Sequence, residues 1–120
     1  MNTLQSKQVA DELVHLHNEA SADSLIRRQK RQQATDQGNV FDHSWSTAYM
    51  AINSDQGQFL YFLATLQKAM NIVEFGCSFG ISTIYLTAAA RDNVGRVITS
   101  DLEPNKVFGH PEKSGDCRLE

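Results

Sequence analysis

The chain has 120 residues and a mass of 13.4 kDa, a length that fits one domain with a single hydrophobic core. Its 11 basic and 14 acidic residues give a formal net charge of −3, which argues against a general nucleic-acid-binding protein because such proteins carry a basic surplus. No apolar run is long enough to cross a bilayer, and the first residues lack the pattern of a secretory signal. We therefore expect a cytoplasmic protein that binds neither nucleic acid nor membrane.

The N-terminal region predicts helix. Residues 1–35 contain neither Gly nor Pro. One apolar stripe at helical spacing indicates a face turned toward a core, formed by Val9, Leu13, Leu16 and Ala20. The basic run of residues 27–33 favours a solvated helix face over contact with an anionic partner. The loop-forming residues 36–39 predict the end of this helix.

The second half of the chain predicts a helix followed by a βαβ unit. Ser54 and Asp55 are expected to cap the helix, whose broad apolar face is formed by Phe59, Leu60, Phe62, Leu63, Leu66 and Met70. Residues 72–75 and 96–100 predict two short strands, and residues 81–90 predict a helix rich in Leu and Ala between them. A strand, a glycine loop, a helix and a second strand in this order predict two parallel strands.

The glycine loop carries the candidate binding residues. Gly76 permits a sharp turn out of the strand, and Gly80 permits close approach at the helix start, where N–H groups and the helix dipole favour an anion. Glu74, at the strand end, can accept hydrogen bonds from an ammonium group. Asp101 ends the second strand 25 residues after Gly76, near the distance at which an acid binds ribose hydroxyls in nucleotide-binding units. The pattern predicts a ligand that joins a zwitterionic amino acid to a nucleoside.

A known family shares this pattern. Glu-x-Gly-x-x-x-Gly-x-Ser-Thr, from Glu74 to Thr83, followed by a strand that ends in an acid, resembles the S-adenosylmethionine-dependent O-methyltransferases of the catechol O-methyltransferase-like group. Residues 54–60 and Asp101-Leu102-Glu103-Pro104 also resemble that family, so the similarity covers about residues 53–107. It implies an α/β fold in which an N-terminal helical region, residues 1–53, precedes part of a Rossmann-like methyltransferase sheet, residues 54–107.

The resemblance also implies the cofactor, S-adenosyl-L-methionine, and six residues that bind it: Glu74, Gly76, Ser78, Gly80, Ser82 and Asp101. By position, Glu74 would contact the methionyl amino group and Ser82 the methionyl carboxylate. Gly76 and Ser78 would line the methionyl pocket through their backbone, and Asp101 would hold the ribose. The resemblance carries over no catalytic residue, and it implies a small-molecule methyl acceptor.

Alternatives remain for several of these residues. The dinucleotide fingerprint G-x-G-x-x-G is absent because Ser78 replaces its middle glycine, which disfavours an NAD-binding protein. Glu103 is the second candidate for the ribose. Cys77 is expected to be a small loop residue, not a nucleophile, because no motif pairs it with a histidine. His15 and His17 lie on different helix faces, and two cysteines are too few for a zinc site, so no metal site is predicted.

The similarity to the family ends after residue 107. Where the family continues as a helix, residues 108–117 contain two Gly and one Pro, which stop a helix. We therefore expect a chain truncated after its second strand, with a divergent, disordered tail over residues 108–120. Such a chain is expected to be inactive alone and to associate with itself through partly exposed strand residues: Ile72, Val73, Phe75, Val97 and Ile98. The rival interpretation is a non-catalytic interaction protein built on a methyltransferase remnant.

Overall fold

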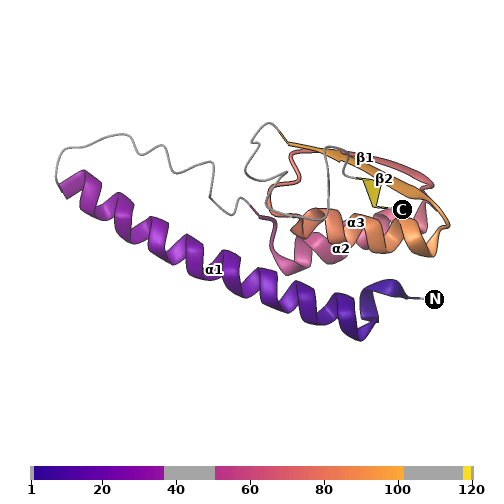
Figure 1. The fold of residues 1–120 in the computed structure, drawn as a ribbon, viewed down its shortest axis with the longest axis horizontal. Coiled ribbons are helices and arrows are strands. Elements are labelled where there is room, and N and C mark those ends of the chain that lie inside the picture. Colours follow the sequence, from indigo (N-terminus) through magenta and orange to yellow (C-terminus); the bar gives the residue numbers. More distant parts are fainter. Residues whose placement is uncertain (1, 37–50, 102–117, 120) are drawn as a thin grey trace.

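The long N-terminal helix lies against the rest of the fold along only part of its length. The computed structural model describes residues 2–36, 51–101 and 118–119, and Figure 1 shows their arrangement. A short 3-10 turn, η1 (Thr3–Gln5), precedes α1 (Lys7–Asp36). Leu13 and Leu16 of α1 are buried, as the predicted apolar stripe requires, whereas Leu25 and Ile26 are exposed. The second half of α1 therefore projects away from the other helices (Figure 1), and it carries the basic run.

Helix α2 (Ser54–Leu66) has its N-cap one residue before the predicted cap. Asn53 is the N-cap: its side-chain oxygen accepts the Gln56 N–H at 2.8 Å, and the Gln56 side chain accepts the Asn53 N–H at 3.0 Å. This reciprocal pair satisfies two amides that the helix itself leaves without acceptors. The prediction that Ser54 and Asp55 form the cap is wrong, because both lie inside the first turn.

The predicted βαβ unit is confirmed. Strand β1 (Asn71–Phe75), helix α3 (Ile81–Asp92) and strand β2 (Arg96–Ser100) follow one another, and the two strands are parallel. The register places Ile72 opposite Val97 and Glu74 opposite Thr99. The larger Rossmann-like sheet that the resemblance implies stays a prediction.

A short third strand, β3 (Arg118–Leu119), pairs antiparallel with β2 and gives the sheet order β1-β2-β3. The sequence predicts disorder for residues 108–120, so the structure differs from that prediction at these two residues. The physical reason is that the outer edge of β2 offers backbone N–H and C=O groups that another strand can pair with. Residues 102–117, including Glu103, lie outside the described residues.

One face of the sheet and one face of α2 are packed against α3. Ile81 and Tyr85 of α3 form a buried cluster with Leu13 and Leu16 of α1. Gly57 allows α2 to approach closely, because a Cβ atom at this position would lie 2.1 Å from the Tyr85 ring. Alternation along the strands turns Val97 toward α3, where it is 2% exposed. The prediction that Val97 is partly exposed is therefore wrong.

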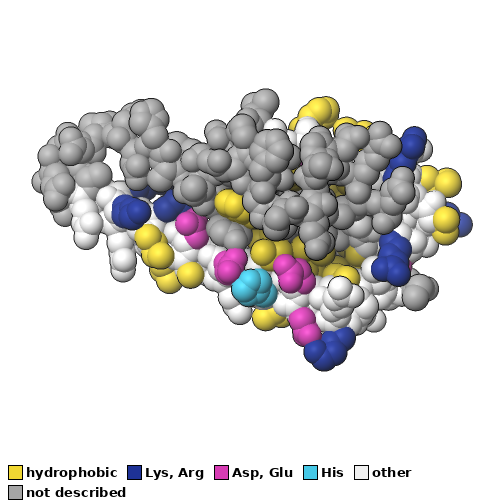
Figure 2. Space-filling model, in the orientation of Figure 1, with side chains coloured by type: hydrophobic (Ala, Val, Ile, Leu, Met, Phe, Trp, Pro, Cys, Tyr) yellow, Lys and Arg dark blue, Asp and Glu magenta, His cyan; other side chains and the backbone are white. Residues whose placement is uncertain are grey.

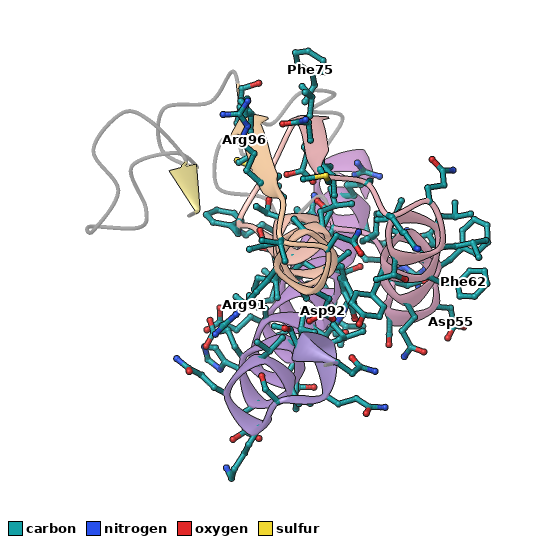
Figure 3. All side chains as sticks on the ribbon, turned by 90° about the vertical axis from the view of Figure 1, so that its right-hand side faces the viewer. Asp55, Phe62, Phe75, Arg91, Asp92 and Arg96 are labelled. Atoms are coloured by element: carbon teal, nitrogen blue, oxygen red, sulfur yellow. The ribbon has the colours of Figure 1, made fainter. Side chains whose placement is uncertain are left out.

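On the opposite face of the sheet, the described residues of β1 and β2 are exposed. Val73 and Ile98 are more than half exposed, and Phe75 is 86% exposed. Figure 3 shows Phe75 pointing away from the sheet and Phe62 pointing away from α2, and Figure 2 shows hydrophobic side chains at the surface above the strands. Phe59, Phe62, Leu66 and Met70, which belong to the predicted apolar face of α2, are exposed as well. Parallel strands in proteins are normally covered on both faces.

A side-chain cluster that sequence reasoning missed joins η1, α2 and α3. The Asp92 carboxylate accepts the Thr3 N–H at 3.0 Å, the Thr3 hydroxyl, and the Tyr61 hydroxyl at 2.5 Å. Burial opposes ionisation of Asp92, but these hydrogen bonds outweigh it and lower the pKa of the carboxyl below its ordinary value of 3.8. Burial first, then the hydrogen bond to Asp92 and its charge, raise the pKa of Tyr61 to about 12.

Within the described residues, no helix has both the length and the apolar character needed to span a membrane.

Asp92→Asn is expected to lower the free energy of unfolding by about 1–3 kcal/mol, because the donors on buried Thr3 and half-buried Tyr61 lose their charged acceptor. The folded-state pKa of Asp92 is depressed, so its contribution is complete above the ordinary value of 3.8 and is lost as the pH falls through the lower folded value. The folded-state pKa of Tyr61 is raised, so its contribution is complete below about pH 10 and is lost as the pH rises toward 12.

Urea unfolding followed by circular dichroism across this pH range measures both effects. The matched control is Asp55→Asn, which changes an exposed carboxylate on α2 and leaves Asp92 untouched. The Asp55 variant should lose stability as the pH falls, as the wild type does. The Asp92 variant should lack this loss, because it has no carboxylate at position 92 to be protonated. An Asp92 variant with the same stability and the same acid slope as the wild type would show that the cluster contributes nothing.

Candidate functional site

The loop between β1 and α3 has a fixed backbone. Gly76, Ser78 and Gly80 have φ angles of +84°, +48° and +95°, all in the left-handed region. The N–H groups of Gly76 and Cys77 donate to the Ser100 carbonyl at 2.6 and 3.1 Å, which ties the loop to the end of β2. Gly80 is the N-cap of α3, and its N–H donates to the Cys77 carbonyl at 2.9 Å. The two glycines therefore set the exit from β1 and the start of α3, as the sequence predicts.

Asp101 directly follows β2 and lies beside this loop. Its Oδ2 atom accepts the Ser78 N–H at 2.8 Å. The structure thus brings together two predicted site residues that are 23 positions apart in the chain. Since the carboxyl ends of parallel strands meet at one edge of a sheet, the loop and Asp101 form a common edge.

Glu74 is surrounded by hydroxyl groups. Its Oε1 atom accepts hydrogen bonds from the Thr83 and Thr99 hydroxyls, each at 2.6 Å, and its Oε2 atom accepts one from the Ser82 hydroxyl at 2.5 Å. The predicted partners of an ammonium and a carboxylate, Glu74 and Ser82, are therefore bonded to each other in this structure. Sequence reasoning missed Thr83 and Thr99, although Thr99 lies opposite Glu74 in the strand register.

The residues at this edge fit a ligand with an amino-acid part and a nucleoside part. A Cβ atom built on Gly76 would meet no atom of the described residues within 4 Å, so the space over the turn is open. The Ser78 hydroxyl is buried and has no hydrogen-bond partner among the described residues. A buried hydroxyl without a partner is costly, which points to a bound group that supplies one. The first N–H groups of α3 have no acceptor within the helix, and they favour an anion.

Comparison with known proteins agrees with this geometry. The sequence model described as "O-methyltransferase" matches residues 19–109, which is more than half of the chain. The chain belongs to the O-methyltransferase family. Over 55 residues it is also 42% identical to a protein of Niastella koreensis named catechol O-methyltransferase.

That similarity covers 46% of this chain and 24% of the relative, so the chain spans about a quarter of the length of the relative it matches. The resemblance predicted from the motif around Glu74 is thereby confirmed at the level of the family. The family match includes the whole βαβ unit and Asp101, together with the second half of α1. The roles of the six predicted cofactor-binding residues stay predictions.

Proposed function

We propose that this O-methyltransferase family member uses its βαβ unit to bind S-adenosyl-L-methionine for methyl transfer to an oxygen atom of a small molecule. The observation that supports this most strongly is the placement of Glu74, the glycine loop and Asp101 at one edge of two parallel strands. Ammonium, carboxylate and ribose hydroxyl groups need an acid, a set of N–H donors and a second acid, and this edge offers all of them. The name of the Niastella relative favours a phenolic acceptor.

Five of the six predicted residues have distinct roles in this proposal. Glu74 would hold the amino group of the cofactor, and Ser82 with the first N–H groups of α3 would hold its carboxylate. Gly76 would let the backbone approach the ligand closely, and Asp101 would accept hydrogen bonds from the ribose while its Oδ2 atom keeps the Ser78 N–H. The Ser78 hydroxyl would gain the partner that it lacks among the described residues.

The chemistry of the cofactor is simple: when bound, it supplies a methyl group on a positively charged sulfur. The residues of this chain would bind and orient that group, and orientation is a large part of the catalytic effect in such transfers.

We further propose that the 120-residue chain does not transfer methyl groups alone and that it associates with itself. Support comes from the match to about a quarter of the relative, 24%, and from the exposed side chains of Val73, Phe75 and Ile98 on one face of the sheet. The same exposed residues favour the second candidate function, a non-catalytic interaction protein, because uncovered apolar surface marks sites of association.

Isothermal titration calorimetry of the 120-residue chain tests the cofactor assignment. We expect S-adenosylhomocysteine to bind more tightly than NADH. Asp101→Asn should weaken the binding of S-adenosylhomocysteine by about 1–3 kcal/mol. The amide retains an oxygen for the Ser78 N–H, but it is a poorer acceptor for the ribose hydroxyls than a carboxylate. Asp55→Asn, on the exposed side of α2, is the control and should bind like the wild type. Tighter binding of NADH would overturn the assignment.

Size-exclusion chromatography with light scattering, combined with a labelled-methyl assay on catechols and other phenols, tests the second proposal. We expect masses above 13.4 kDa and no turnover above the blank without protein. Phe75→Lys, which adds a charge at a strand residue that is 86% exposed, should shift the protein toward the monomer. A monomeric wild type would contradict self-association, and measurable turnover would contradict inactivity.

A further inference from the structure

The hydrogen bonds of Glu74 are distributed unevenly between its two carboxylate oxygens. A carboxylate oxygen can accept about two hydrogen bonds. Oε1 accepts two, from the Thr83 and Thr99 hydroxyls, and Oε2 accepts one, from the Ser82 hydroxyl. Among the described residues, Oε2 therefore accepts one hydrogen bond fewer than Oε1.

The two threonines are rigid neighbours of Glu74. Thr83 is 4% exposed and Thr99 is 8% exposed, and they belong to different elements, α3 and β2. Rotation of the Glu74 carboxylate would break both of their hydrogen bonds where water cannot replace them, which is costly. Thr83 and Thr99 thus fix the orientation of the carboxylate from two sides.

Ser82 differs from the two threonines. It is only half-buried, it is the second residue of α3, and its hydroxyl has one hydrogen, which it donates to Oε2. An ammonium group that reached Oε2 could replace this donor. The released hydroxyl could then rotate and donate to a carboxylate at the start of α3, where the N–H groups already favour an anion. No proton leaves either group in this exchange, since only hydrogen bonds are made and broken.

We propose that Thr83 and Thr99 are positioning residues that hold Oε1 of Glu74, so that Oε2 and Ser82 together receive the amino-acid part of the ligand by exchanging their mutual hydrogen bond. The inference rests on the proposed function and adds to it the atoms that recognise the zwitterion. It distinguishes the amino-acid part of the ligand from the nucleoside part, because Glu74 and its three hydroxyl partners act on the former alone.

Two probe ligands test this distinction. S-adenosylhomocysteine carries the zwitterion, whereas 5′-methylthioadenosine has the same nucleoside and thioether without it. We expect Thr83→Val and Thr99→Val each to lower the affinity for S-adenosylhomocysteine by about tenfold in calorimetric or NMR titrations. The affinity for 5′-methylthioadenosine should stay unchanged. Thr87→Val is the matched control: it makes the same substitution in α3 at a hydroxyl that is buried with no partner among the described residues. This control should change neither affinity.

An equal loss of affinity for both ligands would overturn the inference, because it would show that the two threonines have a merely structural effect. A second measurement does not need a ligand: side-chain coupling constants of Glu74 should report one rotamer in the wild type and averaged rotamers in the Thr83→Val, Thr99→Val double variant. Amide spectra of the double variant serve to confirm that it folds. Failure of the wild type to bind S-adenosylhomocysteine would overturn the proposed function, whereas unchanged coupling constants would overturn the positioning role independently.

Discussion

The hydrogen bonds to the Glu74 carboxylate hold the βαβ unit together at the edge where the candidate site lies. They join β1 to β2 through Thr99 and β1 to α3 through Ser82 and Thr83. Because the glycine loop connects β1 to α3, fixing both elements also fixes the loop. The bonds from the loop to Ser100 and Asp101 then set its position against β2. A single inward-facing acid thus links the packing of the unit to the geometry of its binding edge.

The two faces of the sheet differ in packing within the described residues. The inner face of the sheet meets α3, and α3 in turn meets α1 and α2, with Tyr85 packed against Gly57 and hydrogen-bonded to His17 at 2.9 Å. The outer face exposes Val73, Phe75 and Ile98. A site at the edge of such a sheet can be locally well formed while apolar side chains on one sheet face of the described residues stay exposed. The binding edge is formed while the outer sheet face is exposed. For this reason we propose that the chain binds the cofactor but does not transfer methyl groups alone.

Local sequence signals predicted the helices and strands. They failed where contacts between residues distant in the sequence determine which side chains are buried. Residues 96–100 form the second strand, as predicted, and Asp101 after it lies beside the glycine loop. The side chains of this strand alternate between its two faces. The same alternation buries Val97, which the sequence alone left partly exposed because it could not say which face α3 covers. The cap at Asn53 was missed by one residue, since Ser54 and Asp55 are equally good capping residues.

The contacts of Asp92 and Glu74 were beyond sequence reasoning for a different reason. Thr3 and Asp92 are 89 positions apart, and Glu74 and Thr99 are 25 apart, so no local pattern links them. Threonine is common in strands and helices. Its hydroxyl can be recognised as a partner of an acid only once the fold shows which side chains lie next to it. The family resemblance likewise assigned Glu74 and Ser82 to a ligand, and only the structure shows that they bond to each other.

The most direct test of this account is to remove the charge of Glu74 and measure both stability and amide exchange. Glu74→Gln is expected to lower the free energy of unfolding by about 1–3 kcal/mol and to speed hydrogen exchange at the Gly76, Cys77 and Ser78 amides. Glu12→Gln, at an exposed position of α1, should change neither quantity. A Glu74 variant with wild-type stability and wild-type protection of the three loop amides would contradict the claim that this carboxylate fixes the binding edge.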